Sequence, residues 1–236
     1  MTNLTAAVLD PLLKADPMGP RITYYDDATG ERIEVSTVTL VNWAAKTANL
    51  LRDELGAGPG TRVAVLLPAH WQTAAVLLGV WWIGAEVTLS GSADIALCTS
   101  ERLDEADEMV AGGEVAVLSL DPFGKPAPDL PIGVTDYATA VRVHGDQYTA
   151  EPRPGPALDG RSVDDVLAAT AASVADLGLN AGDRVMSSLS WSTPGGIIAN
   201  LLAVFAAGAS LVQVSNPDPD LLDRRRTAEK VTRDLA

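Results

Sequence analysis

The chain has 236 residues, 47% of them hydrophobic, so it can bury a sizeable core as one domain or two. Its 31 acidic residues outnumber 17 lysines and arginines, which gives a formal net charge of −14. This balance argues against nucleic acid and anionic membrane surfaces as partners, because both require a basic face. The single cysteine, Cys98, excludes an internal disulfide and lies in an apolar run, where a core position is expected.

The sequence also bears on location and metal content. The first residues, MTNLTAAVLDPLLKADP, lack the basic segment that opens a signal peptide. No apolar run is long enough to span a membrane. We therefore expect a protein of the reducing cytoplasm. No spacing of potential ligands is typical of a metal site, and no metal is expected.

The first part of the chain is predicted to form a helix, a β-hairpin and a second helix. Residues 4–13 carry apolar residues on one helical face and end before a proline. Within residues 21–35, two β-rich runs flank Asp-Asp-Ala-Thr-Gly, whose residues favour a turn. Residues 40–56 then carry apolar side chains at helical spacing, which predicts an amphipathic helix.

The chain is organised around residues 58–89. Val63–Leu67 is a short apolar run stopped by a proline, which is typical of a strand buried on both faces. Trp71–Ile83 is long enough for a helix, and Gly84 marks its end. A second β-rich run follows at residues 85–89. Strand, helix and strand in this order predict a parallel sheet with a right-handed crossover.

Residues 179–214 repeat this unit. In the two copies, Arg62 corresponds to Arg184 and Gly84 corresponds to Gly208. Because two copies are too few for a solenoid, the repetition predicts an α/β fold with two similar, doubly wound subdomains and parallel sheets.

The proline-rich sequence EPRPGPALDG separates the two copies. We therefore expect a first subdomain of residues 1–150, including the N-terminal helix and hairpin, and a second subdomain of residues 151–236. A final helix is expected from Leu221 to about Leu235. The remaining predicted elements are strands at 94–98 and 114–120, a helix at 101–110 and a weaker element at 137–143.

Five residues are candidates for ligand binding because they follow strands, where ligands sit in parallel sheets: His70, Ser190, Trp191, Ser192 and Thr193. The structural alternative for the loop is helix capping by Ser192 or Thr193, followed by a proline in the first turn. For His70 the alternatives are general acid–base work or an ordinary surface position.

Two further groups have alternative interpretations. The tryptophans of the central helix, Trp71, Trp81 and Trp82, are core residues, or would mark a partner interface if one face of the helix were exposed. The run Arg224–Arg226 is interpreted as a solvated helix turn, with an anion site as the alternative.

The segments GPGTRVAVLLP and WWIGAEV resemble the adenylate-forming superfamily of acyl-CoA synthetases, luciferases and peptide-synthetase adenylation domains. The second copy, with LSWSTPG followed by an apolar helix and AGASLVQV, resembles the next segment of that family. The likeness covers nearly the whole chain in order. It implies the family's large N-terminal domain, which has two similar subdomains with parallel sheets.

The departures from the family pattern concern its chemistry. The family's phosphate-binding loop, TSGTTGxPKG, is replaced by YTAEPRPGP at residues 148–156, without its lysine and its run of hydroxyl groups. Prolines have no N–H to offer a phosphate, and the Glu151 carboxylate would repel one. Ser192 stands where the family has a histidine, and the chain stops before the family's later motifs and catalytic lysine. The residues at the degenerate phosphate-loop position are Tyr148, Thr149, Glu151, Arg153 and Gly155.

These observations lead to three functional hypotheses. We favour a degenerate, non-catalytic relative that binds a small ligand or a protein partner, with self-association also open and no cofactor expected. The alternative is an acyl-adenylating enzyme or half-enzyme that another chain completes, which would use ATP or AMP. A third possibility is a different enzymatic activity that uses His70 and the loop from Ser190 to Thr193.

Overall fold

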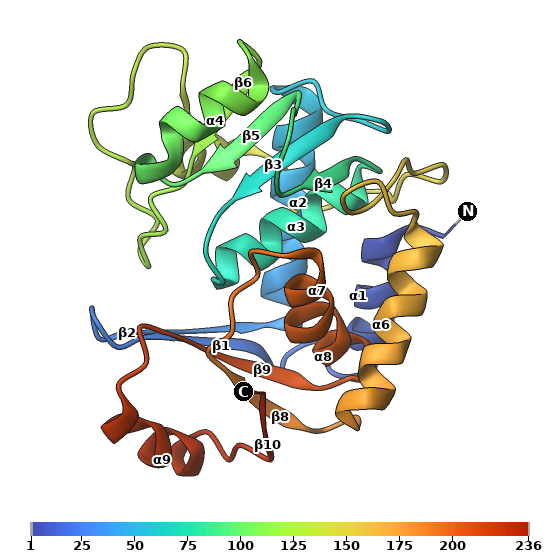
Figure 1. Ribbon diagram of the computed structural model, residues 1–236, viewed down its shortest axis with the longest axis vertical. Coiled ribbons are helices and arrows are strands. Elements are labelled where there is room, and N and C mark those ends of the chain that lie inside the picture. The colour runs from blue at the N-terminus through green and yellow to red at the C-terminus, as the bar shows by residue number, and fades with distance from the viewer. Residues whose placement is uncertain (1, 236) are drawn as a thin grey trace. The chain divides into compact units, whose positions relative to one another are not determined.

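Buried, β-rich runs form two five-stranded sheets in the computed structural model, which describes residues 2–235 (Figure 1). The chain divides into two compact units. Unit 1 contains the residues up to Ala7, Val41–Leu67 and Gln72–Val166. Unit 2 contains Val8–Leu40, Pro68–Trp71 and the residues from Leu167 onward. The α/β fold with parallel sheets and helices is therefore confirmed.

The sheet of unit 1 is parallel throughout, as predicted for the first copy of the repeat. Its strand order is β4-β3-β5-β6-β7. Strand β3 and its two neighbours are buried along most of their length, because helices cover parallel sheets on both faces. The strands are β3 (Arg62–Leu66), β4 (Glu86–Thr88), β5 (Ile95–Cys98), β6 (Glu114–Val117) and β7 (Thr135–Asp136).

Helix α3 (Trp71–Trp82) is apolar on all sides, which is typical of a helix in a protein core. All three of its tryptophans are buried, so they are core residues and not an exposed partner interface. A Cβ at Gly79 would lie 2.9 Å from Thr47, so the glycine allows α3 to pack closely on α2 (Thr37–Asp53). The other helices of unit 1 are α4 (Leu103–Val110), α5 (Tyr137–Ala140) and the 3₁₀ turns η1 (Ser100–Arg102) and η2 (Val141–Val143).

The sheet of unit 2 joins strands from opposite ends of the sequence, and its order is β10-β8-β9-β1-β2. Figure 1 shows the N-terminal hairpin, in blue, beside β9, in red. Ile22 of β1 pairs in parallel with Leu211 of β9. The prediction that this hairpin belongs to the first subdomain is therefore wrong. The strands are β1 (Pro20–Asp26), β2 (Glu31–Ser36), β8 (Arg184–Ser187), β9 (Ser210–Ser215) and β10 (Arg233–Leu235).

The hairpin joins this sheet because the edge of β9 would otherwise have no hydrogen-bonded neighbour. Strands β8 and β9 are the only strands of the second copy, and two strands alone are marginally stable in water. The hairpin supplies its strand β1 to the open edge of β9, and Arg21 reinforces the junction by donating to the carbonyl oxygen of Ala209, 2.5 Å away. Local sequence does not encode this long-range pairing.

The C-terminal segment also differs from expectation. Helix α9 (Pro219–Ala228) ends well before the predicted limit near Leu235. Lys230 adopts a left-handed φ of 54°, and residues 233–235 then pair in parallel with β8. The remaining helical segments are α1 (Leu4–Ala15), α6 (Val163–Leu177), α7 (Pro194–Ile197), the π-helical η3 (Ile198–Leu202) and α8 (Ala203–Ala206).

The two helix–strand junctions of the repeat have the same geometry. Gly84 and Gly208 have φ values of 75° and 79°, which favour glycine after a helix. In each copy the next alanine donates its N–H back to the helix, at 3.1 Å for Ala85 and 3.0 Å for Ala209. Among residues 2–235, no helix is long and apolar enough to cross a lipid bilayer.

Candidate functional site

The segment Tyr148–Pro156, at the predicted phosphate-loop position, lies within unit 1 and is named the proline strap here. The Tyr148 ring lies 5.9 Å from the ring of Trp82, measured between centroids. The guanidinium carbon of Arg52 lies 5.1 Å from the centre of the Tyr148 ring. These contacts anchor the first residue of the strap to α2 and α3.

The backbone N–H groups of residues 151–156, all of which are described, are absent or already used. Glu151 donates to the carbonyl oxygen of Trp82 at 3.1 Å, and Gly155 donates to that of Gly84 at 2.9 Å. The N–H of Arg153 donates to the Glu151 carboxylate at 3.0 Å. The other three positions are prolines, which have no N–H: Pro152, Pro154 and Pro156. No backbone donor in this stretch is left to contact a phosphate.

The strap is also closely packed. A Cβ at Gly155 would lie 2.9 Å from the backbone nitrogen of Gly60, so glycine is required by the close approach. Asn3 holds the same region by donating to the carbonyl oxygens of Trp82 (3.0 Å) and Glu151 (3.4 Å). The crevice lined by Trp81, Gly84 and residues 154–157 has no room for a water molecule. The strap is thus a packed structural element.

The loop after β8, in unit 2, carries four of the five predicted ligand-binding residues. Thr193 accepts the N–H of Gly196 at 3.0 Å and caps α7, with Pro194 in the first turn, so the capping interpretation is confirmed for Thr193. The hydroxyl groups of Ser190 and Ser192 lie 2.9 Å apart and are exposed. Trp191 between them is only 2% exposed.

Side chains from two elements hold this loop in place. Asn200, in the π-helical η3, donates to the carbonyl oxygen of Ser190 at 3.4 Å. Gln213, on β9, donates to that of Leu189 at 3.3 Å. Gln213 pairs across the sheet with Ser187, the last residue of β8. The loop therefore begins at the carboxyl end of β8, beside its parallel neighbour β9, and ligands bind at such positions in α/β proteins.

Two buried polar atoms of this region have no hydrogen-bond partner in the described part of the chain. They are Nε1 of Trp191 and Oε1 of Gln213. An unsatisfied buried polar group costs about 1–3 kcal/mol, and native proteins contain few of them. The first is a donor and the second an acceptor, and Trp191 lies between Ser190 and Ser192, whose hydroxyl groups are exposed. We name this group, consisting of Ser187, Ser190, Trp191, Ser192 and Gln213, the carboxyl-edge cluster.

His70 is only 1% exposed, so its interpretation as a surface histidine is wrong. Its ring lies 4.3 Å from that of Tyr24 on β1, in an edge-to-face arrangement. Its Nε2 lies 3.8 Å from Oε1 of Glu31 on β2. Burial lowers the pKa of His70, although the nearby Glu31 opposes this shift. These contacts place His70 in the packing of the hairpin.

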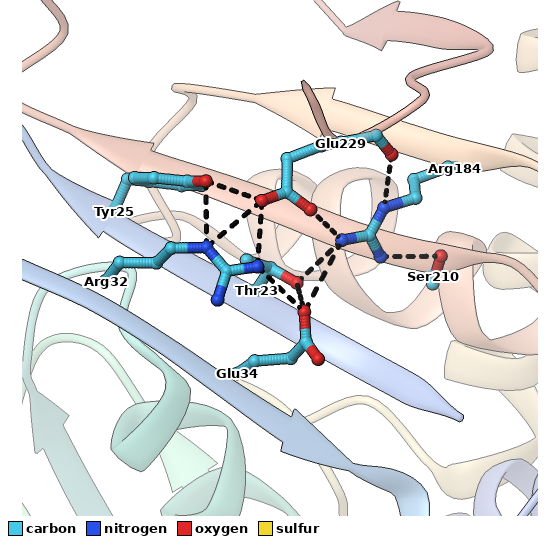
Figure 2. A network of polar contacts seen from close by, with 7 residues as sticks. All are labelled: Thr23, Tyr25, Arg32, Glu34, Arg184, Ser210 and Glu229. Atoms are coloured by element: carbon cyan, nitrogen blue, oxygen red, sulfur yellow. Dashed lines mark hydrogen bonds and ion pairs between the residues drawn. The ribbon is translucent and has the colours of Figure 1, made fainter. Parts of the chain in front are cut away.

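A charged network that the sequence analysis missed lies on the sheet of unit 2, on the face opposite to the one that carries His70 (Figure 2). Figure 2 shows the Glu229 carboxylate between the guanidinium groups of Arg32 and Arg184. The carboxylate accepts hydrogen bonds from Tyr25 Oη at 2.5 Å, from Arg32 Nη2 at 2.9 Å and from Arg184 Nη2. Arg184 also donates to Thr23 Oγ1 at 2.8 Å. One signal was available, because Arg184 is the residue that the repeat aligns with Arg62.

The network keeps Glu229 ionised. Burial by itself would raise the pKa of Glu229, but the hydrogen bonds from Tyr25, Arg184 and Arg32 outweigh it and lower the pKa to about 2. Burial and the Glu229 carboxylate raise the pKa of Tyr25. The polar groups of these side chains are hydrogen-bonded to one another, so the network fastens the end of α9 to the sheet.

The arginine run 224–226 is correspondingly more than a solvated turn. Arg225 is buried and contacts Asp27 through two hydrogen bonds of 3.0 and 2.5 Å. Its guanidinium carbon also lies 4.0 Å from the centre of the Tyr25 ring. Hydrogen bonding with Arg225 lowers the pKa of Asp27. The guanidinium group of Arg225 therefore holds α9 in place and does not form a free anion site.

Comparison with known proteins identifies one close relative by sequence, while no family model matches. A protein of Mycobacterium tuberculosis (strain ATCC 25618 / H37Rv), described as a TIGR03089 family protein, is 68% identical over 239 residues. The match covers 99% of this chain and 98% of that protein.

Solved structures match the fold at low sequence identity. Brucella canis acyl-CoA synthetase superposes with a TM-score of 0.80 at 18% identity, over 99% of this chain and 47% of that one. The acetoacetyl-CoA synthetase from Streptomyces lividans gives 0.77 at 20%, over 98% and 42%. A benzoate CoA ligase from Burkholderia xenovorans LB400 gives 0.73 at 16%, over 95% and 48%. The chain spans about half the length of these structures, and the likeness shows the N-terminal-domain fold of adenylate-forming enzymes.

Proposed function

Because the chain belongs to the TIGR03089 family and has the N-terminal-domain fold of adenylate-forming enzymes, we propose that it binds a small ligand without adenylating it. The proposal has two parts. The first is the loss of nucleotide-phosphate binding at the proline strap. The second is ligand binding at the carboxyl-edge cluster of unit 2.

The loss of phosphate binding is inferred from the backbone N–H groups of residues 151–156, which are either absent or already hydrogen-bonded within the protein. Each charge-assisted contact to a phosphate contributes roughly 1.5–3 kcal/mol. Losing three or four of them would forfeit about 5–10 kcal/mol, which turns a micromolar site into no useful site. Recovering these donors would require breaking the bonds of Glu151 and Gly155 to the end of α3. The Glu151 carboxylate would in addition repel the phosphates.

The carboxyl-edge cluster supports the second part. It offers the buried Trp191 donor, the buried Gln213 acceptor and the exposed hydroxyl groups of Ser190 and Ser192. Every residue of the cluster is uncharged, so it lacks the cation that a carboxylate or phosphate ligand would favour. The chemistry therefore suits a small, uncharged ligand with its own donor and acceptor, such as an amide.

Calorimetric titration of the purified protein with Mg·ATP, and with a non-hydrolysable acyl-adenylate analogue, tests the first part. We expect no binding heat up to millimolar ligand, while an acyl-CoA synthetase of the same fold serves as the positive control. Micromolar binding of either compound would overturn the proposal. It would favour the alternative, an adenylating enzyme or half-enzyme completed by another chain.

Nuclear magnetic resonance of the tryptophan indole N–H groups tests the second part. The chain has five tryptophans, and Trp191→Phe identifies the resonance of Trp191. The probes are benzoate, the acid named for one similar structure, and benzamide, its uncharged analogue. We expect benzamide to shift the Trp191 signal more than benzoate does. A Trp191 signal that neither compound moves at millimolar concentration would contradict ligand binding at this cluster.

A further inference from the structure

The helix after β8 is one residue longer than its counterpart in the first copy of the repeat. In the first copy, Gly84 lies 13 positions after Trp71, the first residue of α3. In the second copy, Gly208 lies 14 positions after Pro194, the first residue of α7. A π-helical turn holds one residue more than an α-helical turn, and η3 forms such a turn within this helix. Single π-helical turns are rare and are frequently found at functional sites.

Asn200 lies at the centre of this π-helical turn and is only 6% exposed. It is the only residue among positions 194–206 with an amide, hydroxyl or charged side chain. Positions 74–82, in the body of α3, contain no such side chain. Burying an amide costs free energy unless it is hydrogen-bonded, so a helix that serves only the core would carry an apolar residue here. The second copy therefore has an unusual turn and an unusual residue at the same place.

The side chain of Asn200 contacts the backbone of the loop after β8. Its Nδ2 donates to the carbonyl oxygen of Ser190 at 3.4 Å. Gly196, four residues earlier in the helix, approaches the same oxygen, since a Cβ at this glycine would lie 2.7 Å from it. The Ser190 carbonyl is thus held by one close backbone contact and one hydrogen bond. The next residue is Trp191, whose buried side chain belongs to the carboxyl-edge cluster.

The position of this loop determines how the carboxyl-edge cluster presents its donor and its acceptor. Nε1 of Trp191 and Oε1 of Gln213 are buried and have no hydrogen-bond partner among the described residues. The same loop orients the Gln213 amide, because Nε2 of Gln213 donates to the carbonyl oxygen of Leu189 at 3.3 Å. A displaced loop would therefore move the donor and release the acceptor at the same time.

We propose that Asn200 is a positioning residue for the carboxyl-edge cluster, and that the π-helical turn serves to hold its amide beside the Ser190 carbonyl. The inference rests on the proposed function and adds a residue that sets the geometry of the site without contacting the ligand. A ligand such as an amide needs the donor and the acceptor at fixed positions, because a hydrogen bond weakens steeply as its angle departs from linear.

Hydrogen exchange of the Trp191 indole N–H tests the positioning without any ligand, and Trp191→Phe identifies its resonance. Asn200→Ala should raise the exchange rate about fivefold, because the loop loses a hydrogen bond. The matched control is Asn49→Ala, which removes a buried amide that donates to the carbonyl oxygens of Gly145 and Gln147 in unit 1. It should leave the Trp191 rate unchanged. An unchanged rate in Asn200→Ala, or equal acceleration by both variants, would overturn the proposal.

Asn200→Asp separates the loss of the hydrogen bond from the loss of the side chain, because it keeps the shape of the residue. An ionised carboxylate cannot donate to the Ser190 carbonyl oxygen, so the Trp191 N–H should exchange faster than in the wild type at pH 8. A protonated carboxyl group can donate, and burial raises its pKa. The ratio of the two exchange rates should therefore fall towards one at pH 5.5. A constant ratio would contradict the role of the hydrogen bond.

Titration with benzamide, followed by the Trp191 indole shift, tests the effect on binding. Asn200→Ala should raise the Kd about fivefold, while Asn49→Ala should leave it unchanged. Equal Kd values for Asn200→Ala and the wild type would overturn the proposal. A wild type that does not respond to benzamide would instead contradict the proposed function, and the exchange rates would still decide whether Asn200 positions the loop.

Discussion

The N–H of Gly155 donates a hydrogen bond to the carbonyl oxygen of Gly84, 2.9 Å away, and so ties the proline strap to the end of helix α3. Gly84 ends the helix in the left-handed region, and this turn exposes its carbonyl oxygen to the strap. The segment at the family's phosphate-loop position is thus fastened along the surface of unit 1 by hydrogen bonds to the end of α3. Substitutions can test both these contacts of the strap and the side-chain contacts that hold unit 2 together.

Gly155→Ala should lower the free energy of unfolding by about 1–3 kcal/mol, because a Cβ would meet the backbone of Gly60 at 2.9 Å and overpack the strap. Gly58→Ala is the matched control, since a Cβ at Gly58 meets nothing within 4 Å. Urea denaturation of both variants measures the difference. Equal stabilities would show that the strap is easily displaced, so that its N–H groups could become available to a phosphate.

Glu229→Gln should make the protein less sensitive to acid. The pKa of Glu229 in the folded protein is about 2, below its ordinary value of 4.5, so ionised Glu229 stabilises the fold above pH 4.5. This contribution, on the order of 3 kcal/mol, is lost as the pH falls from 4.5 towards 2. Unfolding free energies measured across this range should fall less steeply for the variant than for the wild type. Glu108→Gln, at an exposed position on α4, should behave like the wild type.

Arg225→Gln should destabilise unit 2 by about 3–5 kcal/mol, because it leaves the buried Asp27 carboxylate without its charged partner. Arg224→Gln is the neighbouring control at an exposed position and should cost less than about 0.5 kcal/mol. Thermal unfolding of the two variants measures both effects. Equal shifts would indicate that the position of α9 does not depend on this ion pair.

His70→Ala should destabilise the protein by about 2–4 kcal/mol, since it removes a fully buried ring that packs on Tyr24. Ser192→Ala, at an exposed hydroxyl, should change stability by less than about 0.5 kcal/mol. Chemical denaturation distinguishes the two. A stable His70→Ala protein would remove the packing role and reopen the hypothesis that His70 acts in catalysis with the serine loop.

The wild-type protein should lose stability as the pH falls below about 6.5, and His70 is one cause. Burial lowers the pKa of His70 in the fold, so the unfolded chain binds a proton at this residue more readily. The stabilising effect of neutral His70 is therefore present above the unfolded value and is lost as the pH falls. His70→Gln should flatten the stability profile between pH 7 and 5, and an unchanged slope would contradict this assignment.

Much of the fold follows from local patterns. Val63–Leu67 and Trp71–Ile83 are apolar without alternation, and both are buried as a central strand and a core helix. The two glycines that end the repeated helices have the left-handed φ that their position predicted. Thr193 caps its helix, because a hydroxyl before a proline at the first turn has few other local uses. In each case the cause lies within one turn or one strand of the residue.

The sequence by itself determined the periodicity, the caps and the loss of donors in the strap, because a proline lacks its N–H in any fold. Only the tertiary structure decided that the hairpin pairs with β9, that His70 is buried, and that Arg225 is held by Asp27. The same holds for the gathering of Arg32 and Arg184 around the carboxylate of Glu229. These partners lie up to 198 residues apart, and a local pattern carries no information about which distant edge or charge will be met. Burial and pairing at that range arise from the packing of the whole chain.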